Sequence, residues 1–441
     1  MVCIVSLGCP KNFVDTEIAA GSLLCRGLGI TADEDEADIM LINTCAFIDT
    51  ARKESVDVIK GAIRWKKRRE GRRIVVAGCL VQWKNAAQVR EKFPEVDLWT
   101  GIDSVEQMGE MLAHLDNSAA PAVAAQPCYI YNEKTSRVLL TPGHYAYLKI
   151  ADGCSNCCTY CAIPMIRGRF RSRTEESIVK EAEKLASDGV KELILIAQDV
   201  TRYGEDLYHE LRLPSLLKKL CKIDGIEWIR LLYCYPDRIT DELLDVMASE
   251  DKILNYIDLP LQHADGKVLK RMNRTGDKES LLALIEKIRD KLPNAIIRTT
   301  FITGFPGEGE SEFNTLSEFV DEAQFDRLGC FAYSPEENTP AAEFEDQVDD
   351  KVKQRRGEII MEQQYDIFSY KQKQLIDTVQ RCVVDGYDAY TDSYFGRTWM
   401  DAPEIDSAVF FTCRKELDEG DMVDVRIFDT KDYDLMGEVV E

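Results

Sequence analysis

The sequence lacks long apolar runs, a signal peptide and an excess of positive charge. No stretch of about 18 uninterrupted apolar residues occurs, so no membrane-spanning helix is expected. Residues 1–7 have neither the basic flank nor the cleavage site of a signal peptide, and they predict a strand instead. The 441 residues, with 45% hydrophobic and 30% charged side chains, therefore predict a cytoplasmic globular protein of more than one domain.

The net charge of −23 argues against general nucleic-acid binding and favours a basic partner. The excess is uneven, because residues 377–441 hold 17 acidic and 6 basic residues, a net charge of −11. An acidic surface can also serve solubility alone, and this alternative stays open.

Fifteen cysteines in a long cytosolic chain argue against a disulfide framework, which is typical of small secreted domains. Metal or redox use is the expectation for those that cluster. Scattered cysteines are commonly small buried hydrophobes, and we assign no role to Cys3, Cys25, Cys128, Cys221, Cys234, Cys330, Cys382 and Cys413.

Four cysteines lie within residues 154–161, and three of them, Cys154, Cys158 and Cys161, have the spacing C-x3-C-x2-C. Thiolates at such short intervals can surround one metal centre. Three ligands for a four-iron cluster leave one iron open to chelate a small molecule. The set with Cys157 in place of Cys158 also brings three thiols together, so the register has an alternative.

The first 115 residues alternate apolar runs with helical patterns, which predicts a doubly wound α/β domain. The expected parallel strands are residues 2–7, 39–42, 74–77 and 96–100, and the expected helices are residues 13–26, 49–69, a segment after 81, and 105–115.

Cys9, Cys45 and Cys79 each follow one of these strands. The carboxyl ends of parallel strands line one edge of a sheet, where ligands bind. We therefore expect a second three-thiolate metal site, the alternative being three unrelated buried thiols.

A second α/β series begins at Tyr145 and predicts a partial (β/α)6 barrel. Its expected strands are residues 145–150, 192–197, 228–233, 256–259, 296–302 and 327–333. Active sites of barrels lie at the carboxyl ends of the strands, and the Cys154 segment directly follows the first strand. The other strand ends carry Gln198, Asp258 and Gly304. We expect Asp258 and the loop residue His263 to be satisfied structural polar groups.

Four arginines, Arg167, Arg169, Arg171 and Arg173, follow the cysteines. Some of them could balance the charge of a substrate carboxylate, a cluster or a cofactor, although any single one is expected to be structural. Further on, a helical segment at 351–373 leads into short runs at 382–384, 408–412, 422–427 and 438–440. These runs are separated by turns and predict a small antiparallel β barrel.

The cysteine spacing, with aromatic Tyr160 before the last cysteine and a partial barrel around it, resembles the radical SAM superfamily. The three strand-end cysteines resemble its methylthiotransferases. Three further motifs resemble the RimO-type branch, which modifies a ribosomal protein: SLGCPKNFVDTE at 6–17, DLPLQH at 258–263 and DAPEID at 401–406.

The resemblance implies a radical S-adenosylmethionine transferase that adds a methylthio group to the β-carbon of an aspartate in small-subunit ribosomal protein twelve. It implies two 4Fe-4S clusters, one held by Cys154, Cys158 and Cys161 and an auxiliary one held by Cys9, Cys45 and Cys79. Tyr160, Gln198 and Gly304 are expected to contact S-adenosylmethionine. An electron donor and a sulfur source are also implied.

By the same resemblance, residues 1–115 form the methylthiotransferase domain, 116–139 a linker, 140–374 the radical SAM domain and 375–441 an acidic TRAM domain. TRAM domains often bind RNA, which requires a basic face. The charge of −11 fits a basic ribosomal protein instead, so we expect protein docking, no strong RNA binding and no membrane contact.

Two other functions remain. A tRNA adenosine methylthiotransferase would favour a basic C-terminal barrel, and this one is acidic. A zinc or iron–sulfur scaffold without catalysis is the second, but structural zinc sites usually supply four ligands from one local cluster.

Overall fold

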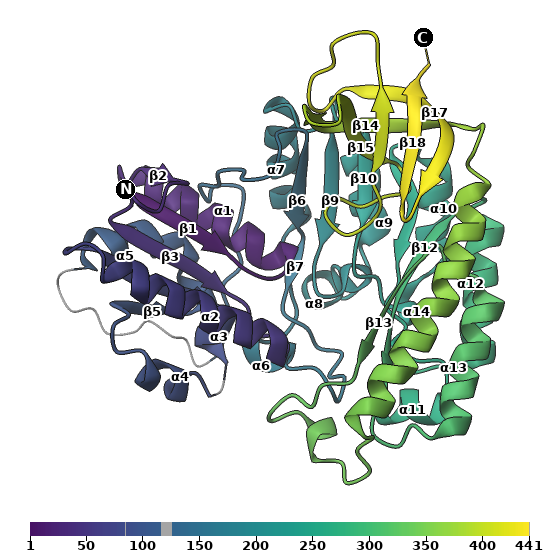
Figure 1. Cartoon of the computed structure of the whole chain (residues 1–441), viewed down its shortest axis with the longest axis horizontal. Helices are drawn as coiled ribbons and strands as arrows, with labels where there is room; N and C mark the ends of the chain where they lie inside the picture. The colour runs from purple at the N-terminus through teal and green to yellow at the C-terminus, as the bar shows by residue number, and fades with distance from the viewer. Residues whose placement is uncertain (84, 116–125, 441) are drawn as a thin grey trace.

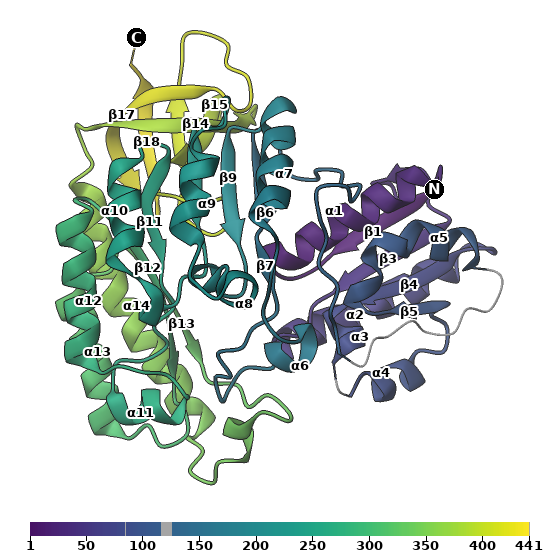
Figure 2. The same ribbon diagram turned by 180° about the vertical axis from the view of Figure 1, so that it is seen from behind.

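The computed structural model describes residues 1–83, 85–115 and 126–440. Within these residues no helix is both long and apolar enough to cross a membrane. An N-terminal α/β domain lies beside a large central α/β domain, and a small barrel at the C-terminus sits over one end of the central strands (Figures 1 and 2).

The N-terminal domain is a five-stranded parallel sheet in the order β2-β1-β3-β4-β5, which confirms the doubly wound prediction. Its strands are β1 (Val2–Ser6), β2 (Ile30–Thr31), β3 (Ile39–Thr44), β4 (Arg73–Gly78) and β5 (Leu98–Thr100). Its helices are α1 (Pro10–Cys25), α2 (Asp49–Lys66), α3 (Cys79–Gln82), α4 (Ala86–Lys92), η1 (Ile102–Gln107) and α5 (Met108–Ala113). The two-residue strand β2 was not predicted, since it is too short to show a pattern.

The central domain is an open six-stranded parallel sheet in the order β13-β12-β11-β10-β9-β6, as predicted for a partial barrel. The strands are β6 (Tyr145–Lys149), β9 (Glu192–Ile196), β10 (Trp228–Leu231), β11 (Ile253–Asp258), β12 (Ile296–Thr303) and β13 (Arg327–Ala332). The covering helices are α7 (Glu175–Ser187), α9 (Leu213–Leu220), α10 (Asp241–Ser249), α12 (Lys278–Lys291), α13 (Glu310–Ala323) and α14 (Asp350–Lys373).

Shorter elements join these units. They are α6 (Ile163–Arg167), η3 (Val200–Arg202), α8 (Glu205–Tyr208), η4 (Pro236–Arg238), α11 (Gly266–Arg271), η5 (Pro340–Glu343) and the two-stranded ribbon β7 (Ala151–Asp152) and β8 (Arg171–Ser172).

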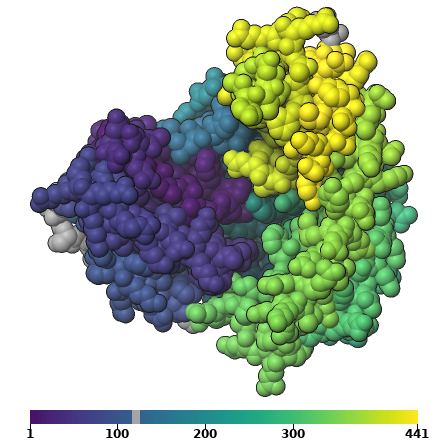
Figure 3. All heavy atoms as spheres, viewed as in Figure 1, coloured from purple at the N-terminus to yellow at the C-terminus, as the bar shows by residue number. Residues whose placement is uncertain are grey.

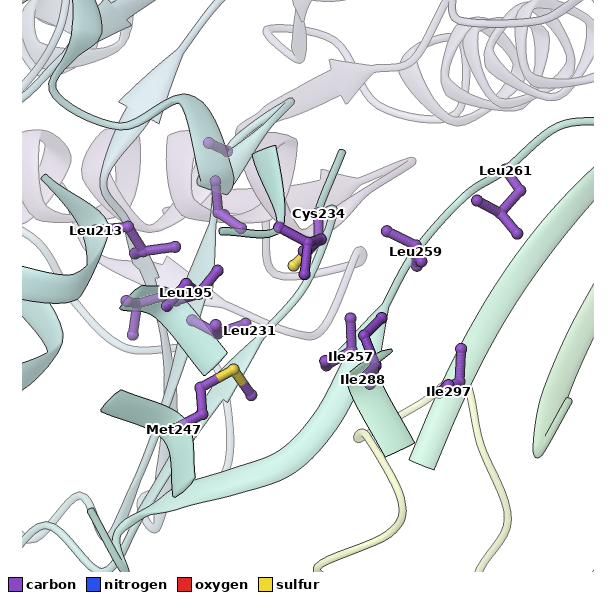
Figure 4. Close-up of a cluster of buried hydrophobic side chains, with 14 of the residues drawn as sticks. Leu195, Leu213, Leu231, Cys234, Met247, Ile257, Leu259, Leu261, Ile288 and Ile297 are labelled. Carbon is purple, nitrogen blue, oxygen red and sulfur yellow. The ribbon is translucent and has the colours of Figure 1, made fainter. Parts of the chain in front are cut away.

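Alternate residues of the central strands point outward and form the core under the helices. Figure 4 shows Leu195, Leu231 and Ile257 from three successive strands on the same side of the sheet. Met247 of α10 and Ile288 of α12 pack in the same cluster. Burial of each such side chain contributes about 1.5–3 kcal/mol and holds the helices against the sheet.

The C-terminal barrel is closed in the order β14-β15-β16-β18-β17. Its strands are β14 (Val379–Asp388), β15 (Ser393–Thr398), β16 (Val409–Thr412), β17 (Met422–Lys431) and β18 (Asp434–Val439). The closed barrel was predicted, but the pairing is not antiparallel throughout, because β16 and β18 run parallel. A return connection through β17 separates these two strands in sequence, so sequence proximity gave no signal of their pairing.

The segment expected to be a linker, residues 116–139, is described by the structure only from residue 126 onward. Residues 116–125 lie outside the described part of the chain, whereas residues 126–139 have no helix or strand and alternate exposed with buried side chains. Tyr131 is 2% exposed, and Arg137 donates to Glu17 of α1 and to Glu181 of α7. This stretch therefore fastens the N-terminal domain to the central one.

Candidate functional site

The three N-terminal cysteines lie at the carboxyl edge of their sheet. Cys9 is the N-cap of α1, with Pro10 as the first helical residue. Cys45 directly follows β3 and Cys79 directly follows β4. Pairing of Ser6 with Asn43 and of Thr44 with Gly78 aligns the three strand ends. This strand register brings the three thiols to one edge of the sheet, as the sequence predicted.

Close backbone approach at this edge requires glycine. Gly8 has φ +93°, and a Cβ there would lie 2.9 Å from the Cys45 sulfur. Gly78 has φ +92°, and a Cβ there would lie 2.6 Å from the Thr44 carbonyl oxygen. Both positions combine left-handed backbone with no room for a side chain, so only glycine brings these loops together.

The second set of cysteines lies in the loop between β7 and β8. The Cys154 N–H donates to the Gly168 carbonyl across this loop (3.1 Å), and the Cys161 N–H donates to the Cys158 carbonyl (3.1 Å). Cys157 is exposed and has left-handed backbone, φ +54°. Its position turns the side chain out of the loop, which explains how four cysteines can be present while three face inward.

One cavity of about 490 Å³ brings both sets together. It is lined by all six cysteines of the two sets, namely Cys9, Cys45, Cys79, Cys154, Cys158 and Cys161, and not by Cys157. Its volume falls within the range of about 300–1,000 Å³ that is typical of ligand sites. Figure 3 shows the surface hollowed where the N-terminal domain meets the later parts of the chain.

An ionic network joins the two domains beneath the cavity. Arg167 donates to Asp15 of α1 (2.8 Å) and to Asp152 of β7 (3.0 Å), and Lys149 of β6 pairs with both carboxylates. The guanidinium of Arg167 also lies 3.6 Å from the Cys79 sulfur. The network holds the edge with the N-terminal thiols against the loop with the central ones.

Burial and nearby cations act in opposite directions on the thiols. Burial raises the pKa of Cys79 to about 12 and that of Cys154 to about 11. Burial also opposes ionisation of Cys9, but Lys11 and Arg167 outweigh it and lower the pKa of Cys9. Buried thiols of this kind ionise readily only when a metal compensates the charge, because metal binding displaces the proton.

Within the described part of the chain, no three His, Cys, Asp or Glu side chains have the geometry to hold a metal ion. In a four-iron cluster each thiolate binds a different iron atom, so its ligands lie farther apart than those of one ion. Two all-thiolate sets with Arg167 beside Cys79 and Arg274 3.8 Å from the Cys158 sulfur fit such anionic clusters by donor chemistry.

Two of the three residues expected at S-adenosylmethionine line the cavity. Tyr160 packs edge-on against Phe305, with the ring centroids 6.4 Å apart. Gln198 donates from Nε2 to Asp152 (3.1 Å), and its buried Oε1 has no hydrogen-bond partner among the described residues. An orphaned buried acceptor of this kind suits a ligand ammonium group.

Gly304 is not among the residues that line this cavity. Its N–H donates to Glu308 (2.8 Å), and its open side faces Lys353 of α14. The glycine lets α14 pack closely against the end of β12.

The other polar residues at the strand ends have structural partners. His263 Nδ1 accepts the Asp265 N–H (2.9 Å), so Nε2 carries the proton and donates to Glu308 (3.2 Å). Asp258 accepts from the Tyr233 N–H (2.9 Å) and from Arg298 (3.0 Å).

Sequence reasoning missed Lys11 and Arg274, which both line the cavity. Lys11 stands two positions after Cys9, within the SLGCPKNFVDTE motif at 6–17. Its closeness in sequence to a predicted metal ligand could have marked it as a site residue. Nothing local in the sequence marked Arg274, which reaches the cavity from the segment after α11.

Comparison with known proteins agrees with this architecture. Residues 148–320 match the radical SAM superfamily, residues 1–101 match uncharacterized protein family UPF0004, and residues 376–440 match the TRAM domain. The ribosomal protein uS12 methylthiotransferase RimO of Desulfitobacterium hafniense is 47% identical over 100% of this chain and 98% of its own. The protein of the same name from Trichlorobacter lovleyi is 45% identical over the same shares. The chain belongs to the RimO family.

As a RimO-family member, the chain is a radical SAM methylthiotransferase, as the sequence predicted, and the tRNA-modifying alternative is not favoured. Membership of the radical SAM superfamily brings S-adenosylmethionine and one 4Fe-4S cluster.

Solved structures show the same fold at low identity. The methyltransferase TsrM from Kitasatospora setae, with tryptophan and an S-adenosylmethionine analogue bound, has a TM-score of 0.55 at 13% identity over 75% of this chain and 72% of its own. The cobalamin-dependent radical enzyme OxsB has a TM-score of 0.52 at 15% identity over 84% of this chain and 58% of its own.

Proposed function

We propose that this chain attaches a methylthio group to the β-carbon of an aspartate in ribosomal protein uS12. The observation that carries the proposal is the single cavity lined by both three-cysteine sets. A substrate carbon in this cavity lies within reach of the site where S-adenosylmethionine binds and of the site that holds sulfur. The substrate places the reaction in the cytoplasm.

We propose that Cys154, Cys158 and Cys161 hold one 4Fe-4S cluster and that Cys9, Cys45 and Cys79 hold a second. When bound, these clusters and S-adenosylmethionine supply the radical and sulfur chemistry, with an electron donor and a sulfur source provided from outside. Cys157 is excluded from the first set because it is exposed and does not line the cavity.

The chain's own residues bind and orient the reactants. In this proposal Gln198 Oε1 accepts a hydrogen bond from the ammonium group of S-adenosylmethionine, and Tyr160 packs against its adenine. Arg274 offsets the charge of the Cys158 thiolate, and Arg167 does the same for Cys79. We leave Gly304 out of this set, because its N–H donates to Glu308 and it packs against Lys353.

We further propose that residues 375–441 dock the basic substrate protein. Among the described residues of the barrel, nine carboxylates are exposed on its strands and loops: Asp392, Glu404, Glu416, Asp418, Glu419, Asp424, Asp429, Asp432 and Glu438. Exposed tyrosines, including Tyr390 at 96%, lie among them. Such a surface attracts a basic protein and repels a phosphate backbone.

The domain boundaries belong to the same proposal: residues 1–115 hold the auxiliary cluster, residues 140–374 perform the radical step and residues 375–441 dock the substrate. Mass spectrometry of uS12 after incubation with the anaerobically reconstituted enzyme tests the reaction. A gain of one methylthio group on a single aspartate is expected. Modification of tRNA with unmodified uS12 would refute the proposal.

A further inference from the structure

Lys11 and Arg274 differ from every other buried cation in the described part of the chain. Ten lysines and arginines are buried there, and eight have a carboxylate within 4.0 Å: Arg52, Arg72, Lys149, Arg167, Arg173, Arg230, Lys353 and Arg397. Lys11 and Arg274 have none, and both line the cavity. A buried charge without a counterion is costly, so an anion is expected to complete such a site.

Arg274 already has partners for its guanidinium. It donates to the Pro260 carbonyl (2.7 Å) and to the Cys158 sulfur (3.8 Å), and it stacks on Tyr235 with 4.3 Å to the ring centroid. Its position beside Cys158 accounts for its charge, since the thiolate is the anion that it faces.

The ammonium of Lys11 also lies near a thiol, that of Cys9, whose pKa it lowers, but among the described residues it makes no hydrogen bond to a sulfur or oxygen atom. It lies 3.2 Å from the centroid of the Tyr233 ring, and no oxygen atom of the described residues accepts a hydrogen bond from it. The side chain is 7% exposed, so water has little access. An ammonium group has three N–H donors. The ring face attracts its positive charge but does not satisfy all three donors, so N–H groups remain for a ligand.

The position of Lys11 selects the ligand. It is the second residue of α1, whose N-cap is Cys9, and therefore lies beside the set of thiols proposed to hold the sulfur-donating cluster. In aspartate the carboxylate is one bond from the β-carbon. A group that binds the carboxylate while sulfur reaches that carbon must lie next to this set of thiols.

We infer that Lys11 binds the side-chain carboxylate of the substrate aspartate and so selects aspartate at the modified position. This inference rests on the proposed function. The same chemistry occurs in the carboxylate of S-adenosylmethionine, and the experiment separates the two sources. A charge-assisted hydrogen bond from a lysine to a buried carboxylate is stronger than one between neutral groups. The preference for aspartate over asparagine should therefore be large enough to measure.

The test compares the reconstituted holoenzyme with its Lys11→Met variant, which keeps length and apolar character, and with Lys180→Met as a control. Lys180 lies on α7 with a side chain 50% exposed, and its ion pair within the described part of the chain is with Glu176. Each enzyme is titrated with uS12 and with uS12 carrying Asp→Asn at the modified position, and affinities are measured by fluorescence anisotropy. Iron content and S-adenosylmethionine cleavage without uS12 are measured in parallel.

The wild-type enzyme and Lys180→Met are expected to bind the aspartate form about 10- to 100-fold more tightly than the asparagine form. Lys11→Met, compared with the wild-type enzyme at equal iron content per chain, is expected to lose this difference. Equal weakening of both forms, or an unchanged difference, overturns the inference. Loss of cleavage without uS12 assigns Lys11 to the cofactor carboxylate and also overturns it. If uS12 binds with this selectivity but is never modified, the proposed function fails and the inference stands.

Discussion

Arg167 of the central domain places its guanidinium 3.6 Å from the sulfur of Cys79 in the N-terminal domain. The same guanidinium holds Asp15 and Asp152, one carboxylate from each side of the domain boundary. One buried side chain therefore links the fold of the cavity to the thiols that line it. Separation of the two domains would take Asp15 away from Arg167 and Lys149 and leave these charges without their partner.

Replacement of Arg167 by Met is expected to destabilise the protein by about 3–5 kcal/mol, because it leaves Lys149 as the one cation that pairs with these two buried carboxylates among the described residues. Arg355→Met is the matched control, since Arg355 pairs with Glu358 and Glu362 at 59% exposure and should cost less than about 1 kcal/mol. Urea unfolding measures both. Equal small losses would show that the network contributes no more than a surface pair.

Cys158→Ala is expected to abolish cleavage of S-adenosylmethionine, whereas Cys157→Ala is expected to leave it within about twofold. The physical reason is position, since Cys158 lines the cavity and Cys157 is exposed outside it. Formation of 5′-deoxyadenosine in the reconstituted enzyme measures the effect. The reverse pattern would show that residues 154, 157 and 161 are the ligands.

Cys45→Ala is expected to spare cleavage and to block methylthiolation, because Cys45 belongs to the N-terminal set. Iron content should fall from about eight to about four atoms per chain. Iron analysis, 5′-deoxyadenosine and modified uS12 are measured on one preparation. A wild-type value of four irons, or loss of cleavage in the variant, contradicts two independent clusters.

The sequence predicted the elements whose signal is local. Apolar runs marked β1, β3 and β4, and the thiols beyond them had to converge because parallel strands end at one edge. Strand β15 was missed, since residues 393–398 contain no apolar run. The parallel pairing of β16 with β18 was missed because it joins segments that are not consecutive.

The same limit applied to the site. Six cysteines could be assigned to two sets from spacing and strand order, and the cavity contains all six. Whether a buried cation finds a carboxylate depends on chain segments far apart in sequence. Lys149 pairs with Asp15 across the domain boundary, whereas Lys11, four residues before Asp15, pairs with no carboxylate of the described residues. No sequence pattern distinguishes the two cases.

The contact between the C-terminal barrel and the central domain is expected to weaken in acid, because Asp385 at this contact loses its charge. This carboxyl accepts from His144, which precedes β6, and pairs with Arg397 of β15. Burial disfavours its charge, but His144 and Arg397 outweigh burial and lower its pKa from 3.8. Because the folded pKa lies below the unfolded one, the stabilisation is complete above about pH 4 and is lost as pH falls through the folded pKa.

The measurement is the difference in unfolding free energy between wild type and Asp385→Asn, taken in urea from pH 7 to pH 2.5. The difference should be constant above about pH 4.5 and shrink below pH 4. A difference that grows as pH falls would show that the carboxyl is stabilised in its protonated form.

The acidic barrel provides the last test. Glu416→Gln, Glu419→Gln and Asp432→Asn remove three exposed charges that make no hydrogen bond or ion pair to other described residues. Combined, they are expected to weaken binding of uS12 about threefold to tenfold at low ionic strength, with less effect at high salt, because exposed charges steer association and are screened. Glu183→Gln, Glu242→Gln and Glu286→Gln remove the same charge from exposed sites on α7, α10 and α12 and form the matched control. Equal loss in both triple variants would mean that net charge attracts the substrate, and tighter binding of the barrel variant to RNA than to uS12 would remove the barrel's assigned role.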